Sequence, residues 1–481
     1  MTDRTLTDRT LTEPEQTADW FRPALLIVTA ITLLRWLLLA FDRTDLYVDE
    51  SQYWLWGQEF AFGYYSKPPL IGWLIGAVTT LAGSDSPFWV RMPGAFLHGA
   101  TALILGAWAA RLYGARAAVL TAATYATVPF TALGSLLIST DTVMAPFFAA
   151  ALYAHHRLAE TRAPKFALWA GAAIGAAFMA KYAAIYFLIG VALAALRPQG
   201  RIGWRNAALL LLAFLVVISG NLIWNISHQF TTLSHTVDNV GWVRQDNPLA
   251  ALNFASAAEF VLSQFAVAGP VIFAATLIAI RKLPIQAAFV IPPLLVVTVQ
   301  ALLGTAQANW AVAAYFAGIP LAIGLLQNRP RWLTASFAVN AVFCITLPLL
   351  TIFTWVQWQG APLIERQLGR AAMSRQIIAI AHAQGNPPIL ADNRSVLADL
   401  FYTGQAEGVT IYAPRPKGRA QNHYEQRYPL PADLTGPLLW ITKTAPACAT
   451  ATYALDATGG AYRKSGYVAY LVPAACANAQ Q

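Results

Sequence analysis

The sequence predicts an α-helical protein that crosses a membrane many times and carries a small α/β domain outside the membrane, near its C-terminus. Charged residues make up only 11% of the 481 residues and hydrophobic residues 57%, whereas a soluble domain carries roughly 25% charged residues. Apolar stretches close to the ~20 residues that span a bilayer also follow one another along the chain. A cytosolic enzyme, a collagen-like fibre and a disordered chain are therefore excluded.

About eleven of these stretches are predicted as transmembrane helices within one membrane domain, residues 23–357. The first is not a cleavable signal peptide, because it is long, contains Arg35 and lacks a small-residue cleavage site. The predicted spans are 23–41, 88–110, 117–136, 142–157, 166–180, 182–196, 206–224, 258–280, 285–303, 310–327 and 332–355.

The basic residues orient these helices. Lys and Arg gather in alternate connecting turns that are nearly free of acids, and the positive-inside rule places those turns in the cytoplasm. The turns are Arg111–Arg116, Arg157–Lys165, Arg197–Arg205, Arg281–Lys282 and Arg329–Arg331. The net charge of +9 therefore reflects topology rather than nucleic-acid binding, and the C-terminus is predicted to lie outside.

Both ends of the chain differ from its apolar middle. Residues 1–22 form a polar tail that repeats TDRTL, and we expect it to be cytoplasmic and disordered. From residue 358, prolines separate short apolar runs after a predicted helix at 363–384, which indicates a soluble α/β domain over 358–481. The runs are 389–391, 409–412, 438–442 and 468–472. In that domain, Cys448 and Cys476 would either form a disulfide or remain free thiols.

The first external loop, residues 42–87, concentrates polar side chains. Asp49 and Glu50 lead into an aromatic-rich segment with Tyr53 that is predicted as an interfacial helix. Tyr65 and Lys67 follow, and two prolines after Lys67 hold the backbone extended. Solvated acids and a snorkelling lysine would explain these residues without any function. Further polar residues on the same face favour a functional site instead: Arg91, Asp141, Lys181, Asn225 and His228.

This cluster suits the transfer of a group from a phosphate leaving group. A carboxylate can act as general base on an acceptor hydroxyl or amine, and cations can neutralise the charge that develops on a departing phosphate. Aromatic grooves within the lipid would hold a long isoprenoid tail. No metal-ligand motif of recognisable spacing is present, so we predict no metal site, although Asp49, Glu50 and Asp141 could share a divalent cation.

Several motifs follow one another in the order of a known family. They are Asp49-Glu50-x-x-Tyr53, Gly63-Tyr64, Lys67-Pro68-Pro69-Leu70, Arg91-x-Pro93, Ser139-Thr140-Asp141, Lys181-Tyr182, Asn221–Asn225 with His228, Asn309-Trp310 with Tyr315, and Asn422-His423-Tyr424. Over residues 24–480 the chain resembles the GT-C polyprenyl-phosphate glycosyltransferases. It is most similar to the bacterial branch that contains the aminoarabinose (lipid A) transferases and the protein O-mannosyltransferases.

The resemblance implies an inverting transfer of a sugar from a polyprenyl-phosphate donor to a cell-envelope acceptor, which is lipopolysaccharide, another glycan or a protein. It implies multi-pass insertion in the bacterial inner membrane, with the reaction on the periplasmic face. Asp49 would be the catalytic carboxylate, supported by Glu50 and Asp141. The implied contacts of the donor phosphate are Lys67, Lys181 and Arg91. The expected substrate contacts are Tyr53, Tyr65, Asn225, His228 and Trp310.

One position departs from the family pattern. The aminoarabinose transferases typically have Arg three residues after the catalytic Asp, where this chain has Gln52. The change removes one phosphate-binding cation, so the resemblance identifies neither the sugar nor the acceptor.

Two other functions would also explain the apolar composition of the chain. A secondary transporter would place its polar site near the bilayer midplane, between inverted repeats, whereas here the acids gather at one surface and no repeat is visible. A non-catalytic member of the same fold would keep the helices without the chemistry.

Overall fold

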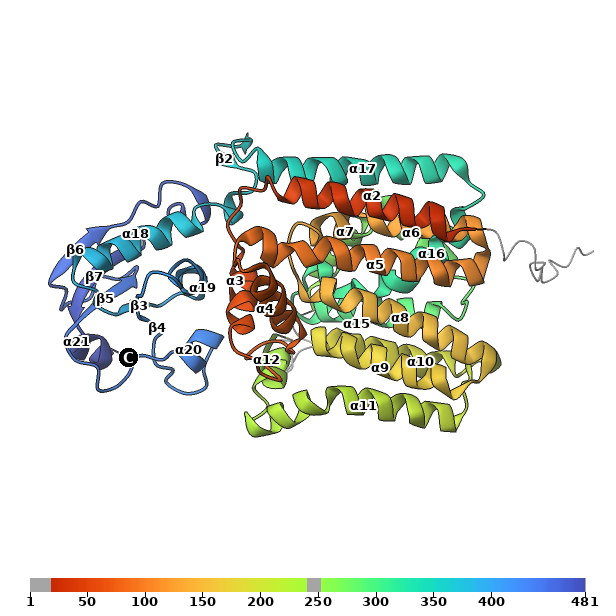
Figure 1. Ribbon diagram of the computed structural model, residues 1–481, viewed down its shortest axis with the longest axis horizontal. Helices are drawn as coiled ribbons and strands as arrows, with labels where there is room; N and C mark the ends of the chain where they lie inside the picture. The colour runs from red at the N-terminus through yellow and green to blue at the C-terminus, as the bar shows by residue number, and fades with distance from the viewer. Residues whose placement is uncertain (1–18, 240–251, 481) are drawn as a thin grey trace, which may run out of the picture.

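The structure consists of a helical bundle and a mixed α/β domain that packs against one end of it (Figure 1). This computed structural model describes residues 19–239 and 252–480. The N-terminal tail, for which we expect disorder, lies almost wholly outside the described residues. The bundle extends from Phe21 to Ile352, and the main sheet lies between Ile389 and Pro473.

The bundle helices bury a core that is rich in alanine and aromatic residues. They are α2 (Phe21–Leu39), α5 (Pro87–Tyr113), α6 (Ala115–Thr127), α7 (Pro129–Gly134), α8 (Thr140–Thr161), α9 (Pro164–Ala180), α10 (Tyr186–Ala194), α11 (Trp204–Ser227), α13 (Phe254–Val267), α14 (Pro270–Ile280), α15 (Ala287–Leu303), α16 (Ala313–Leu326) and α17 (Pro330–Ile352). The α2 and α17 helices lie along one side of the bundle, and α11 lies along the opposite side (Figure 1).

Four of the described helices, α2, α5, α11 and α17, are long and apolar enough to cross a membrane, and the bent pair α13–α14 would make five. Large apolar side chains such as Leu212 and Val216 on α11 point outward and are exposed, as lipid-facing residues are. The protein is therefore a membrane protein. The other apolar helices are shorter, so the count of eleven spans stays a prediction.

Two predicted spans are not continuous helices. Residues 117–136 divide into α6 and α7, because Pro129 has no N–H with which to continue the helix. Residues 258–280 divide into α13 and α14, which meet at 112°. Gly269 lies at this bend with a φ of +84°, which favours glycine. The prediction of one continuous helix is wrong at both places.

The connection between α2 and α5 contains two helices. The predicted interfacial helix is α3 (Val48–Gly57), and the apolar helix α4 (Leu70–Ala82), which the sequence did not indicate, packs beside it. Glycine makes this contact close, because a Cβ on Gly76 would lie only 2.3 Å from the Gly57 carbonyl oxygen. Both helices lie between the bundle and the C-terminal domain (Figure 1).

A five-stranded mixed sheet forms the centre of the C-terminal domain, in the strand order β4-β3-β5-β7-β6. The first three strands, β3 (Ile389–Ala391), β4 (Ile411–Tyr412) and β5 (Pro437–Thr442), are parallel. The strands β6 (Ala451–Ala454) and β7 (Val468–Pro473) are antiparallel to each other, and β7 is antiparallel to β5 with Trp440 opposite Tyr470. The β6 strand and a short hairpin, β1 (Gln357–Trp358) with β2 (Ala361–Pro362), lie outside the four apolar runs.

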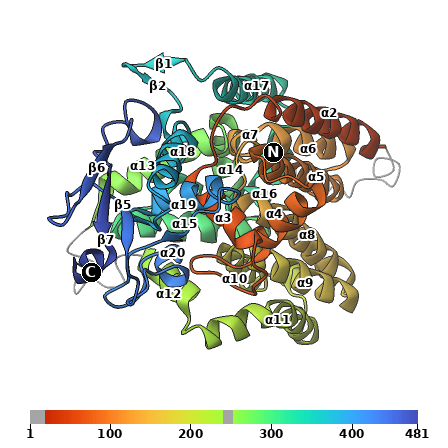
Figure 2. The same cartoon turned by 60° about the vertical axis from the view of Figure 1, so that its left-hand side comes forward.

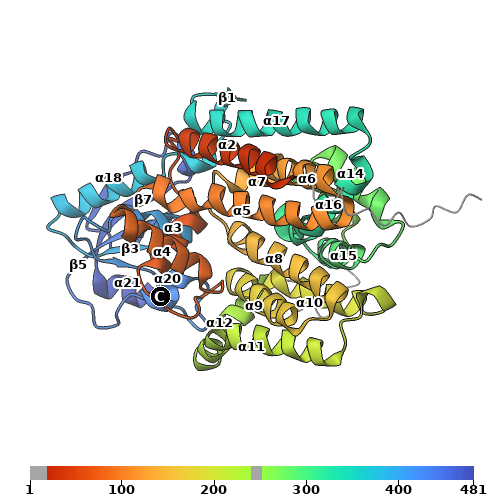
Figure 3. The same ribbon diagram turned by 45° about the vertical axis from the view of Figure 1, so that its right-hand side comes forward.

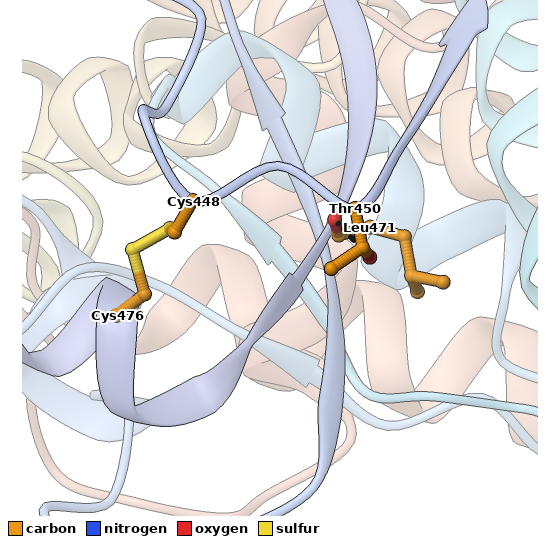
Figure 4. Close-up of a disulfide and its surroundings, with 4 residues drawn as sticks. All are labelled: Cys448, Thr450, Leu471 and Cys476. Atoms are coloured by element: carbon orange, nitrogen blue, oxygen red, sulfur yellow. Dashed lines mark hydrogen bonds between the residues drawn. A yellow bond between two sulfur atoms is a disulfide. The ribbon is translucent and has the colours of Figure 1, made fainter.

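Helices α18 (Arg370–Ala383) and α19 (Arg394–Thr403) pack together beside this sheet, and α20 (His423–Arg427) and α21 (Ala474–Gln480) are shorter. The α18 helix begins later than residue 363, because Gly369 precedes it with a φ of +77°. Cys448 and Cys476 are joined in a disulfide that ties α21 to the loop before β6 (Figure 4). Beside it, Thr450 donates a hydrogen bond to the Leu471 carbonyl at 2.9 Å. The structure thus decides between the two alternatives for the cysteines.

The C-terminal domain contacts the membrane part through α3, the loop that follows α3, and α12 (Thr231–Asn239). These segments share one side of the bundle with α20 (Figures 2 and 3). The α19 helix packs on α3, where the rings of Trp54 and Tyr402 meet edge to face at 4.9 Å. Three arginines of the domain form ion pairs with acids of the membrane part. The pairs are Arg394 with Asp49, Arg427 with Glu59, and Arg419 with Asp238.

Candidate active site

Asp49 lies in the first turn of α3. Tyr47 is the N-cap residue, and Glu50 completes a capping box by accepting the Tyr47 N–H at 2.9 Å. Two carboxylates in the first turn also interact favourably with the helix dipole. Asp49, Gln52 and Tyr53 are spaced i, i+3 and i+4, so they share one face of the helix. The local sequence therefore both starts the helix and aligns these three side chains.

Glu50 and Arg91 form a buried ion pair that joins α3 to α5. Nε and Nη2 of Arg91 donate to the two Glu50 oxygens at 3.0 and 2.8 Å. Arg91 also donates to Thr44 and Asp42, and Glu50 accepts the Ile138 N–H. The Arg91 side chain has no exposed surface. This geometry favours a positioning role for both residues over the expected phosphate contact of Arg91 and direct catalytic support from Glu50.

Two cavities adjoin at Lys67. The polar cavity has a volume of about 350 Å³ and is lined by Asp49, Gln52, Tyr53, Tyr65, Ser66, Lys67, His235, Arg394, Gln421 and Asn422. The apolar cavity has a volume of about 720 Å³ and is lined by Ser66, Lys67, Pro68, Lys181, Tyr182, Ala183, Ile185, Tyr186, Thr236, Leu295, Val296, Val297, Val299, Gln300 and Trp310. Ser66 and Lys67 belong to both walls, so a ligand that filled both cavities would pass the Lys67 ammonium.

Lys67 is a half-buried cation at this junction. Burial lowers its pKa, and the nearby Lys181 ammonium lowers it further. Within residues 19–239 and 252–480, its Nζ takes part in no hydrogen bond or ion pair. Pro68 and Pro69 keep this segment out of the helix that begins at Leu70. An anion between the two lysines would relieve their mutual repulsion, which is what a phosphate site requires.

Asp141 holds Lys181 at the wall of the apolar cavity. Nζ of Lys181 donates to both Asp141 oxygens at 2.7 and 2.8 Å, and Asn309 donates to the same carboxylate at 3.1 Å. Ser139 caps α8 by accepting the Thr142 N–H, which places Asp141 in the first turn. The structure therefore brings Asp141 and Lys181 together as a pair near Lys67.

Aromatic side chains line both cavities. Tyr53 and Tyr65 lie in the polar cavity, and the Tyr65 hydroxyl donates to the Ala420 carbonyl of the C-terminal domain at 3.0 Å. Trp310 lies instead in the apolar cavity. The His235 ring packs against the Tyr65 ring, with 5.0 Å between the ring centroids. Burial lowers the pKa of His235 to about 4, with a further contribution from the Lys67 ammonium, so the imidazole is neutral at pH 7.

Asn225 and His228 line neither of these two cavities. The buried Asn225 amide donates to the Tyr182 hydroxyl at 3.2 Å and to the Asn221 carbonyl at 3.0 Å, which joins α11 to the segment after α9. His228 is exposed and stacks on Trp224 with 4.0 Å between ring centroids. The geometry therefore does not favour the substrate contacts that were expected for these two residues.

Arg394 enters the polar cavity from the C-terminal domain, although no sequence motif points to it. Asn393 caps α19 by accepting the Ser395 N–H at 2.8 Å, which places Arg394 at the first helical position. Nε of Arg394 donates to Oε1 of the Gln52 side chain at 2.9 Å, and Nη2 pairs with Asp49. A cation thus reaches Gln52, the position where the family pattern has Arg. The two residues are 342 positions apart, so no local pattern could have revealed the contact.

The residues present do not fit a shared divalent cation. Each of the three carboxylates forms an ion pair with a different side chain. Asp49 pairs with Arg394, Glu50 with Arg91, and Asp141 with Lys181. In the described part of the chain, no group of three or more His, Cys, Asp or Glu residues could hold a metal ion. We therefore derive no step through a metal.

Comparisons with known proteins identify the family. Residues 66–224 match the family described as dolichyl-phosphate-mannose-protein mannosyltransferases. The chain is also 40% identical over 472 residues to the lipid A galacturonosyltransferase RgtD of Rhizobium johnstonii, which covers 95% of this chain and 99% of that protein. The chain belongs to the GT-C family of membrane glycosyltransferases. Membership of this family makes the protein an enzyme, so the alternative of a secondary transporter is wrong.

Two solved structures share the fold of this glycosyltransferase. ArnT from Cupriavidus metallidurans in the apo state has a TM-score of 0.63 and 13% identity, covering 94% of this chain and 98% of that chain. ArnT bound to undecaprenyl phosphate has a TM-score of 0.65 and 13% identity, covering 93% and 97%. At this identity the likeness concerns the fold alone, and it confirms the predicted GT-C architecture.

Proposed function

We propose that this glycosyltransferase moves a galacturonic acid residue from a polyprenyl-phosphate donor to lipid A, with inversion at the anomeric carbon. The name of RgtD suggests the sugar and the acceptor, and ArnT bound to undecaprenyl phosphate suggests the type of donor. The observation that carries the proposal is the junction at Lys67, where an apolar cavity adjoins a polar cavity that contains Asp49.

The donor occupies both cavities in this proposal. Its polyprenyl chain lies in the apolar cavity, between α10 and α15. Its phosphate lies at the junction, where Lys67 and Lys181 contact it, and the sugar extends into the polar cavity. Asp141 does not touch the phosphate but positions Lys181. Tyr53 and Tyr65 would line the sugar site, and Trp310 would contact the chain.

Asp49 acts as the general base in the proposed reaction. Its carboxylate takes the proton of an acceptor hydroxyl, and the oxygen attacks the anomeric carbon. The bond between that carbon and the phosphate oxygen breaks, and its electron pair leaves with the polyprenyl phosphate. Lys67 and Lys181 stabilise the charge on this leaving group. A single displacement of this kind inverts the configuration of the sugar.

The proposed setting is the bacterial inner membrane. Eleven spans with a cytoplasmic N-terminus would place the Lys/Arg-rich turns inside. The membrane domain, residues 23–357, would then present its 42–87 loop and the C-terminal domain, residues 358–481, to the periplasm. A disulfide between Cys448 and Cys476 agrees with an oxidising compartment.

Reconstituted transfer tests the function. We expect purified protein, supplied with polyprenyl-phosphate galacturonate and lipid A, to increase the mass of lipid A by one hexuronic acid residue, detected by mass spectrometry. Free polyprenyl phosphate should form in equal amount. A lipid A fraction of unchanged mass, with the donor intact, would contradict the proposal. Transfer to another glycan or to a peptide in parallel reactions would retain the enzyme class but refute the acceptor.

Lys67→Ala should raise the apparent KM for the donor by about 10- to 100-fold, because it removes charge-assisted hydrogen bonds to the phosphate. The KM for the acceptor should stay within about threefold of the wild-type value, because the acceptor does not contact Lys67 in this proposal. A threefold change corresponds to less than about 1 kcal/mol. Initial rates with each substrate varied in turn measure both constants. Lys165→Ala, which removes an exposed lysine on the opposite side of the bundle, is the matched control. A larger effect on the acceptor would refute phosphate binding by Lys67.

A further inference from the structure

We propose that Arg394 binds the carboxylate of the transferred uronic acid, so that the C-terminal domain selects the sugar. The proposal rests on the proposed galacturonosyl transfer and adds a residue that recognises the sugar. Its starting point is a contact between distant parts of the chain: Arg394, at the start of α19, reaches Asp49 and Gln52 on α3.

The distribution of cations between the two cavities separates a phosphate site from a sugar site. Lys181 lines the apolar cavity, Lys67 lines both cavities, and Arg394 lines the polar cavity. A phosphate held by the two lysines therefore directs the sugar toward Arg394. The volume of the polar cavity, about 350 Å³, falls in the range of roughly 300–1,000 Å³ that is typical of small-molecule sites.

The guanidinium has the geometry and the free donors for a carboxylate. Arg394 has five N–H groups in a planar fork that matches a carboxylate, and its contacts with Gln52 and Asp49 use Nε and Nη2. Its side chain is 39% exposed and that of Asp49 is 49% exposed. A half-exposed ion pair of this kind contributes little stability, so a substrate carboxylate can replace Asp49 at small cost.

The position of Arg394 is unfavourable for the helix that carries it. A cation at the first helical residue faces the positive end of the helix dipole, and Asn393 already provides the cap of α19. Arg394 therefore does not serve to start the helix. Its side chain contacts groups that line the polar cavity, as expected of a residue that serves the site.

Sugar recognition is coupled to the base through Asp49. When a uronate carboxylate occupies Arg394, the Asp49 carboxylate loses its partner and can accept the proton of the acceptor hydroxyl. A neutral sugar leaves the Asp49 carboxylate paired with Arg394, so that it is less available to the acceptor hydroxyl. The same arginine thus favours the acidic sugar both in binding and in the chemical step.

Two matched donors test this inference. Transfer to lipid A is measured with polyprenyl-phosphate galacturonate and with polyprenyl-phosphate galactose, which carries an uncharged hydroxymethyl group in place of the carboxylate. For Arg394→Gln we expect kcat/KM with the galacturonate donor to fall by about 10- to 100-fold, as for the loss of a charged hydrogen-bond partner. With the galactose donor, kcat/KM should stay the same or rise. For Arg394→Lys we expect a fall in kcat/KM with the galacturonate donor that is smaller than that of Arg394→Gln, because lysine keeps the charge but lacks the planar fork.

The Glu59–Arg427 pair supplies the control, because it also joins the C-terminal domain to the first loop but lies outside both cavities. Arg427→Gln should leave the preference between the two donors unchanged. If Arg394→Gln, with a wild-type melting temperature, loses the same factor with both donors, Arg394 serves the phosphate or domain docking and the inference is overturned. If that variant does not fold, Arg394→Lys with an unchanged donor preference overturns it. A wild-type enzyme that transfers no galacturonate contradicts the proposed function itself.

Discussion

Asp49→Asn is expected to reduce the rate of sugar transfer by about 10²- to 10⁴-fold, the range typical of a lost general base. The amide keeps the shape of the carboxylate and can still accept a hydrogen bond from Arg394, so the protein should fold and insert as the wild type does. Single-turnover transfer from the polyprenyl-phosphate donor to lipid A measures the chemical step directly.

Glu59→Gln is the matched control for this variant. Glu59 belongs to the same external loop and pairs with Arg427 of the same domain, but lies outside both cavities. Its replacement should leave the transfer rate near the wild-type value. Near-normal transfer by Asp49→Asn would remove Asp49 from the catalytic mechanism.

Arg91→Met is expected to destabilise the protein by about 3–5 kcal/mol, because it leaves the buried Glu50 and Asp42 carboxylates without their cation. Thermal unfolding in detergent measures the change as a lower melting temperature. The double variant Arg91→Met with Glu50→Leu should regain part of the lost stability, because it also removes one of the two carboxylates that Arg91→Met leaves unpaired. Glu50 is the one that accepts two hydrogen bonds from Arg91.

An exposed ion pair provides the comparison for Arg91. Arg111 pairs with Glu160 at 3.0 Å, and its side chain is 40% exposed, so Arg111→Met should cost only about 0–1 kcal/mol. This pair of variants also distinguishes the two roles considered for Arg91. A wild-type melting temperature with a raised KM for the donor would restore the expected phosphate contact and exclude the positioning role.

The sequence predicted the parts of the site that lie close together along the chain. Asp49 and Tyr53 are four residues apart on one helix, so helical periodicity alone places them on one face. Pro68 and Pro69 marked Lys67 as part of an extended segment. The order of motifs in the chain indicated the GT-C family, which the similarity to RgtD and the fold of ArnT support.

The parts that the sequence did not predict depend on contacts between distant residues. Arg394 lies in a domain whose position on α3 no local pattern encodes, and Glu50 and Arg91 have the same charges whether they act in catalysis or form a buried pair. The α4 helix, with only 13 residues, is too short to be recognised as a span. The bend at Gly269 depends on backbone conformation, and hydropathy does not record it.

The contact between the C-terminal domain and the membrane helices has the layout of an interface between separate proteins. An aromatic contact of Trp54 with Tyr402 is accompanied by three arginines of the domain, each of which pairs with an acid of the membrane part. Interfaces with polar rims are wet, and salt screens exposed ion pairs. Water and salt can therefore replace these exposed ion pairs one at a time while both folded parts stay intact.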